Sequence, residues 1–143
     1  MRLRALGVAF LVLATAACGG SKSPTDPSQG LNVPFSQTDL VVGTGRQAAT
    51  GNSVTVNYSG WLYNPSAAEN KGQLFDTSIG KAPFQFTLGG NVISGWNQGV
   101  VGMAVGGKRR LVIPPSLGYG STGSGPIPPN ATLVFDVEVI SIQ

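Results

Sequence analysis

The chain has 143 residues, of which 41% are hydrophobic and 10% charged, and its formal net charge is +3. This length predicts one domain with short appendages, and the hydrophobic fraction argues against disorder along the whole chain. Histidine is absent from the sequence, which excludes histidine metal sites and histidine general bases, and the weak charge leaves no strong nucleic-acid footprint.

The first 17 residues have the pattern of a lipoprotein signal peptide. Two arginines stand among the first four residues, and residues 5–14 form an apolar stretch that is too short to span a bilayer of roughly 30 Å. Small residues then precede Cys18, the single cysteine, in a pattern that resembles a bacterial lipobox, although Thr15 stands where leucine is usual. The resemblance implies that the Cys18 thiol receives a diacylglycerol and that the signal peptide is cut before it.

A lipidated Cys18 would anchor the protein to the bacterial cell envelope, on the periplasmic face of the inner or the outer membrane. One alternative is a secreted or periplasmic soluble protein with an incidental thiol, and another is a retained membrane anchor. A single cysteine forms no internal disulfide, so the fold does not depend on oxidation. Residues 18–30 are rich in serine, proline and glycine and lack periodicity, which predicts a flexible tether. The folded domain is then expected over residues 31–143.

Strand signals dominate this domain. They lie at residues 39–42, 53–62, 84–88, 108–113 and 132–142, and most of these segments alternate apolar with polar residues. Five strands without long helical segments favour an antiparallel sheet.

One segment breaks the alternation. Residues 93–103 place apolar side chains at positions 93, 96, 100 and 103, a spacing that marks one face of a helix. Ser94 is a candidate for the N-cap, and Gly102 or Gly106 for the end. The internal glycines would each cost about 1 kcal/mol in an isolated helix, so packing has to hold it. One short helix against an antiparallel sheet of five to six strands predicts an α+β fold.

Two polar segments have weaker implications. Residues 108–110 are Lys-Arg-Arg at the start of a strand. A nucleic-acid or lipid-headgroup patch is one interpretation, but no aromatic residues are interleaved, so a solvated strand edge is expected. Residues 63–71 are polar and small, which predicts a solvated hairpin extension.

The last third of the chain carries the most specific pattern. A Gly-Trp pair at 95–96 lies in the helical segment, Gly-Tyr-Gly at 118–120 opens a glycine-rich loop, and residues 126–136 run from a Pro-Pro turn into an alternating strand. Their order and spacing resemble the FKBP-type peptidyl-prolyl isomerases, and the resemblance covers about residues 38–143. It implies that family's fold, a twisted antiparallel sheet wrapped around one short helix.

The reaction of that family is rotation of an X-Pro peptide bond over a barrier of about 18–20 kcal/mol. The twisted transition state loses amide resonance and charge separation, so an apolar pocket favours it over the planar, polar ground state. A fixed donor can hold the carbonyl oxygen that precedes the proline. The chemistry therefore needs aromatic walls, a floor of proline size and one or two polar groups, with no cofactor, metal or nucleophile.

Each of these groups has a counterpart at the matching position of this sequence. The resemblance implies catalytic roles for Asp76, Tyr119, Trp96, Tyr58 and Phe135. It implies substrate-binding roles for Phe75, Phe84, Val92, Ile93 and Ile127. Taken singly, residues of these types are more often plain core or turn residues, so only their joint pattern favours a pocket.

In the family's arrangement, Tyr58 would hold Asp76 near the substrate carbonyl. The Ile93 N–H and the Tyr119 hydroxyl would donate to the substrate, and Ile127 would close the top of the pocket. The loop that ends at Ile127 is one residue shorter than in the best-known eukaryotic members, and a proline at 126 stands where they often carry isoleucine. The rim is therefore expected to bind different sequences.

The sequence thus predicts a peptidyl-prolyl cis-trans isomerase that assists the folding of exported or envelope proteins. Its expected partners are proline-containing polypeptides, macrolides such as rapamycin as inhibitors, and a membrane through Cys18, with no nucleic acid; a monomer is expected. The alternative is a non-catalytic module that holds a proline-containing segment of an envelope partner in the same groove. The presence of Asp76, Tyr119 and Trp96 favours the enzyme, because a decayed binding module could have lost the polar groups.

Overall fold

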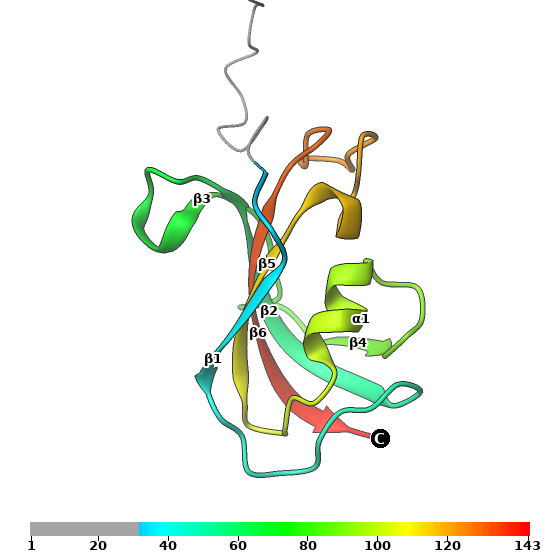
Figure 1. Cartoon of the computed structure of the whole chain (residues 1–143). Helices are drawn as coiled ribbons and strands as arrows, with labels where there is room; N and C mark the ends of the chain where they lie inside the picture. Colours follow the sequence, from blue (N-terminus) through cyan, green and yellow to red (C-terminus); the bar gives the residue numbers. More distant parts are fainter. Residues whose placement is uncertain (1–31) are drawn as a thin grey trace, which may run out of the picture.

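Six β-strands and one α-helix make up the part of the chain that the computed structural model describes, residues 32–143 (Figure 1). The strands are β1 (Ser36–Val41), β2 (Ser53–Tyr63), β3 (Lys71–Thr77), β4 (Phe84–Thr87), β5 (Lys108–Ile113) and β6 (Leu133–Ile142). Helix α1 covers Ser94–Val100, and two 3-10 turns cover Ala68–Asn70 and Pro115–Leu117. All strand pairs are antiparallel, in the order β1-β5-β6-β2-β3, and β4 pairs with the first part of β2. The predicted α+β fold is confirmed.

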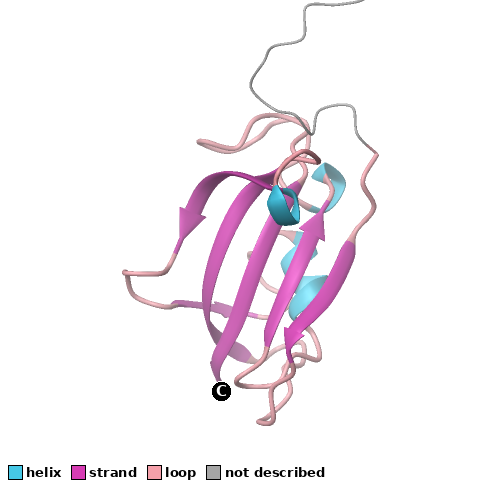
Figure 2. Cartoon of the chain, turned by 90° about the vertical axis from the view of Figure 1, so that its left-hand side faces the viewer, coloured by secondary structure: helices cyan, strands magenta, loops and turns pink. Residues whose placement is uncertain are grey.

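The helix packs on one face of the sheet, and the core fills the space between them (Figure 2). Along β2, Val54 and Val56 are fully buried and Tyr58 is half-buried, as the period-two pattern predicted. Trp96 and Val100 of α1 belong to the same buried cluster. The predicted helix face and the predicted strand face therefore meet in one core.

Two glycines let α1 approach β5 closely. A Cβ atom at Gly95 would lie 2.6 Å from Cγ2 of Ile113, and one at Gly99 would lie 2.5 Å from Cδ2 of Leu111. Both neighbours are fully buried, and a close-packed interior gives them little room to move. The glycines that weaken the isolated helix are thus the residues that allow it to pack.

The start of α1 differs from the prediction. Ile93 is the N-cap residue, Ser94 is already helical, and no side chain caps the helix. At the other end, Gly102 follows with a φ of +83°, and its N–H donates to the carbonyl of Ala48 at 2.8 Å. Gly102, one of the two glycines predicted to end the helix, therefore stands directly after its C-terminal cap.

Arg109 is buried against the end of α1. It is 8% exposed, and its guanidinium donates to the carbonyls of Gly99 (2.8 Å) and Val101 (3.2 Å). It also donates to Asp39 of β1 at 2.6 Å. A cation here pairs carbonyls that the helix leaves unsatisfied and interacts favourably with the helix dipole. The expectation that residues 108–110 form a solvated strand edge is therefore wrong.

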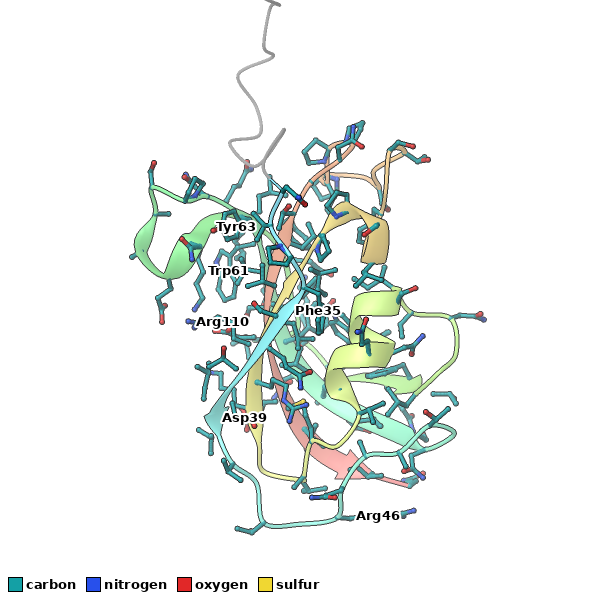
Figure 3. All side chains as sticks on the ribbon, viewed as in Figure 1. Phe35, Asp39, Arg46, Trp61, Tyr63 and Arg110 are labelled. Atoms are coloured by element: carbon teal, nitrogen blue, oxygen red, sulfur yellow. The ribbon has the colours of Figure 1, made fainter. Side chains whose placement is uncertain are left out.

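The face of the sheet away from α1 carries a cluster of charged side chains beside Trp61. Figure 3 labels Trp61 and one of the charged residues, Arg110. Arg110 donates to the carboxylate of Asp136 at 2.8 and 3.1 Å. Lys71 Nζ lies 2.8 Å from the same carboxylate and 4.3 Å from the ring centre of Trp61. Glu69 lies 3.1 Å from each of the two cations. Burial alone would raise the pKa of Asp136, but the hydrogen bonds from Arg110 and Lys71 outweigh it and hold this pKa below its ordinary value.

Strand β3 has no counterpart among the predicted strands. It forms one edge of the sheet, its side chains are exposed or half-exposed, and its register against β2 shifts twice. A strand with no fully buried face needs no regular alternation, so the period-two search misses it. The hairpin extension before β3 ends with Glu69 and Asn70, whose φ angles are positive, 55° and 57°.

Strand β1 forms the other edge of the sheet. It begins three residues before the predicted segment 39–42.

No helix in residues 32–143 is long and apolar enough to cross a membrane. The predicted signal peptide, Cys18 and the tether to residue 30 lie outside the described residues.

Candidate functional site

One pocket of about 360 Å³ gathers side chains from β2, β3, β4, β6, α1 and the loops before α1 and after β5. Its lining residues are Tyr58, Phe75, Asp76, Phe84, Asn91, Val92, Ile93, Trp96, Tyr119 and Phe135. All the predicted site residues of the folded domain except Ile127 are among them. The fold thus brings together residues that lie up to 77 positions apart in the sequence, from Tyr58 to Phe135.

Aromatic rings form the floor and walls. Trp96 is 4% exposed and sits in the centre of the group. Four rings contact its indole with centroids 5.2 to 6.0 Å away and steep interplanar angles: Tyr58, Phe84, Phe86 and Phe135. Such edge-to-face contacts are the favoured geometry for aromatic pairs and fix the orientation of the floor.

A phenol and a carboxylate supply the polar side of the pocket. The Tyr58 hydroxyl donates to Oδ2 of Asp76 at 2.5 Å, and the Thr77 N–H donates to Oδ1 at 2.8 Å. Burial raises the pKa of Tyr58, and the hydrogen bond to Asp76 raises it further. Tyr58 therefore remains a neutral donor that holds the carboxylate in place, as the sequence predicted.

Tyr119 lies in the loop after β5 and is 37% exposed. Burial, and after it the charge of Asp76, raise the pKa of Tyr119. No described residue hydrogen-bonds its hydroxyl, which leaves the neutral phenol able to donate to a ligand in the pocket.

Ile93 places a main-chain donor at the pocket. Its carbonyl accepts the N–H groups of Trp96 (3.0 Å) and Asn97 (3.3 Å), and its own N–H has no partner within residues 32–143. Asn97 also bonds Gly89 and Gly90, which fixes the loop that leads into α1. The pocket therefore has a preorganised amide donor on a rigid turn.

Two residues depart from the prediction. Ile127 is 6% exposed and belongs to the buried core, and it is not among the residues that line the pocket, where the resemblance placed it at the top. Its main chain forms reciprocal bonds with Ser124 (2.8 and 2.9 Å), which turn the loop inward beside Gly123 at φ +70°. Asn91 lines the pocket and was missed; its only signal in the sequence is its position directly before the predicted pair at 92–93.

The arrangement suits a planar or cyclic apolar group held by few polar contacts. An aromatic floor takes the ring, and a free amide and a free hydroxyl can hold an oxygen atom beside it. Asp76 is the one carboxylate among the lining residues. Across residues 32–143, no three His, Cys, Asp or Glu side chains group as in a metal site.

The sequence that forms this pocket is similar to known proteins. A protein-family model described as FKBP-type peptidyl-prolyl cis-trans isomerase matches residues 44–140, which include every lining residue. The peptidyl-prolyl cis-trans isomerase FKBP53 of Arabidopsis thaliana is 52% identical over 101 residues, which cover 69% of this chain and 20% of that protein. An FK506-binding protein of Neisseria meningitidis serogroup A is 47% identical over 107 residues, which cover 73% of this chain and 92% of that protein.

The chain is also similar to a solved structure. The crystal structure of FkpA from Escherichia coli matches with a TM-score of 0.67 and 40% identity, covering 76% of this chain and 48% of that one. The chain thus spans about a fifth of the Arabidopsis protein and about half of FkpA, but nearly all of the Neisseria protein.

Proposed function

The chain belongs to the FKBP-type peptidyl-prolyl cis-trans isomerase family, and we propose that it accelerates rotation about X-Pro bonds in the pocket around Trp96. The observation that carries the proposal is the joint presence of an aromatic floor, a phenol–carboxylate pair and an unpaired main-chain donor in one cavity. These are the groups that rotation without a covalent step requires.

The proline ring rests on the indole of Trp96, inside the aromatic walls. Planar X-Pro amides owe their barrier to resonance, which carries a dipole, and transfer into apolar surroundings disfavours that dipole relative to the twisted form. The Ile93 N–H donates to a substrate carbonyl and fixes the chain on one side of the rotating bond. The walls then hold the ring while the rest of the peptide turns.

Asp76 and Tyr119 supply the electrostatic part. As resonance is lost, the proline nitrogen no longer donates its lone pair to the carbonyl carbon, which becomes more electrophilic, and the fixed carboxylate of Asp76 lies at the pocket to interact with this carbon. Tyr119 donates to a substrate oxygen from the loop after β5. Since Tyr58 already holds Asp76, the carboxylate needs no reorganisation at the moment of rotation.

We further propose a setting for this activity. The signal-like start and the lipobox around Cys18 support a lipid-anchored protein of the bacterial cell envelope that acts on exported or envelope proteins. Relatives named FK506-binding proteins support inhibition by macrolides such as rapamycin, which would occupy the proline site. The domain is proposed to work as a monomer.

The competing function is a non-catalytic module that holds proline-containing segments in the same groove. The test follows cis-to-trans conversion of a short Leu-Pro peptide with the full chain, with and without rapamycin. Acceleration that rapamycin abolishes supports the enzyme. Binding of rapamycin by a folded chain that gives no acceleration would overturn the enzyme and leave the module.

A further inference from the structure

The residue that follows β3 makes hydrogen bonds that the proposed mechanism does not use. Ser78 is polar but only 4% exposed. Its Oγ accepts the main-chain N–H of Tyr58 at 2.8 Å, and its own N–H donates to the carbonyl of Tyr58 at 2.9 Å. Ser78 thus holds both main-chain groups of a residue whose side chain lines the pocket.

These bonds replace the sheet ladder at the point where β3 leaves it. Ser59 and Thr77 form the last pair of the β2–β3 ladder. One position further, the N–H of Tyr58 finds the Ser78 side chain in place of a main-chain carbonyl. The Ser78 hydroxyl is itself satisfied, since it lies 3.2 Å from Oδ1 of Asn57 and 3.5 Å from the carbonyl of Tyr58. A buried hydroxyl with both donor and acceptor used is a rigid element.

The same short segment holds Tyr58 at its other end. The phenol of Tyr58 donates to Asp76, which lies two residues before Ser78. A displacement of the Tyr58 main chain would therefore move the phenol and the carboxylate bonded to it, as well as the ring contact with Trp96 at 5.2 Å.

We infer that Ser78 is a positioning residue of the pocket, whose hydroxyl fixes the main chain of Tyr58 and through it the orientation of Asp76. The consequence for catalysis rests on the proposed function; the consequence for geometry does not. Thr77 does not replace it. Of the two main-chain groups of Tyr58, the Thr77 hydroxyl bonds only the carbonyl, at 3.0 Å, and its other contacts are with Ser59 and Ile79, so it gives the N–H of Tyr58 no acceptor.

The geometric consequence is tested by carbon-13 NMR of the full chain labelled in its tyrosines, because the Cζ shift reports the hydrogen bond of each phenol. Ser78→Ala is expected to move the Tyr58 signal toward its position in Asp76→Ala. Ser59→Ala is the matched control, since it removes a hydroxyl of the same hairpin that bonds Thr77 (2.8 Å) and no group of Tyr58. A Tyr58 signal that stays in place in folded Ser78→Ala overturns the proposal.

The catalytic consequence is tested by a double-mutant cycle. Ser78→Ala is expected to lower kcat about tenfold with little change in KM, and to lower it no further in a chain that already carries Asp76→Ala. Equal losses in both backgrounds would indicate general damage and would contradict the proposal. If the wild type gives no acceleration, the proposed function fails, while the NMR comparison still decides the role of Ser78.

Two further variants keep the test decisive. Loss of the Ser78 hydroxyl leaves a buried N–H unpaired, which is costly. If Ser78→Ala does not fold, Ser78→Cys takes its place in both measurements, because a thiol is a weaker acceptor of similar shape. Ser78→Thr retains the hydroxyl and is expected to keep both the Tyr58 signal and kcat; loss of both in a folded Ser78→Thr chain would contradict the assignment.

Discussion

At the scale of single residues, Trp96 serves the core and the pocket together. It is 4% exposed and contacts four aromatic rings. Trp96→Ala should therefore lower the free energy of unfolding by about 3–5 kcal/mol, the usual cost of emptying a large aromatic site. Urea denaturation measures this loss. Trp61→Ala, a half-exposed tryptophan on the other face of the sheet, should lose clearly less, and equal losses would contradict the core placement of Trp96.

Most of the pocket could be predicted because its residues match the pattern of the family position by position. Tyr58 on β2, Phe84 on β4 and Trp96 on α1 also lie on elements that periodicity predicts. Asp76 and Tyr119 depend on the resemblance alone, since the sequence does not predict β3 and the loop after β5 has no period. Ile127 could not be placed in this way. Its direction depends on the turn at Ser124, which is set by loop hydrogen bonds and not by any periodic pattern.

At the scale of elements, the contact between α1 and β5 makes a glycine necessary inside a helix. Gly99→Ala would gain about 1 kcal/mol in an isolated helix, but here the new Cβ would press on Leu111. We expect a net loss of about 1–3 kcal/mol from overpacking. Thermal unfolding of Gly99→Ala beside the exposed control Gln98→Ala measures the sign, and a more stable Gly99→Ala chain would refute the close packing.

The charge cluster on the outer face predicts a dependence of stability on acid pH. The pKa of Asp136 is lowered in the folded chain, so its contribution is complete above the unfolded value near 3.8 and is lost as the pH falls through the lower folded value. Asp136→Asn should therefore be less stable than the wild type at pH 7, with a difference that shrinks below about pH 4.

Urea midpoints between pH 7 and pH 2 measure this difference. Ser141→Ala, which changes a half-exposed uncharged side chain on the same strand, should keep the pH profile of the wild type. A constant gap between Asp136→Asn and the wild type across this range would rule out the coupling.

Elements whose burial follows their own sequence could be predicted, and elements held by their neighbours could not. β2 alternates buried with part-exposed residues over most of its length, and β6 is buried along its first half and alternates after it; the sequence predicts both strands. β3 is an exposed edge, and Arg109 is buried only because the carbonyl groups at the end of α1 and Asp39 surround its guanidinium. No local pattern in the sequence encodes a partner that lies on another strand.

At the scale of the whole molecule, the proposed anchor at Cys18 decides where the domain works. The full chain expressed in bacteria should sediment with membranes, and Cys18→Ala should appear in the soluble fraction, because acyl chains supply about 0.8 kcal/mol per buried methylene. Fractionation and immunoblotting measure the distribution. Sedimentation of Cys18→Ala with the membranes would contradict the lipid anchor.

The central claim is that the pocket around Trp96 accelerates X-Pro rotation through its fixed carboxylate. The most direct measurement is kcat/KM for a Leu-Pro peptide with the full chain, beside Asp76→Ala, Tyr119→Phe and the exposed control Glu138→Ala. The account predicts clear catalysis by the wild type and the control, and a loss of about 10- to 100-fold in Asp76→Ala with a smaller loss in Tyr119→Phe. Equal rates for the wild type and Asp76→Ala would contradict it.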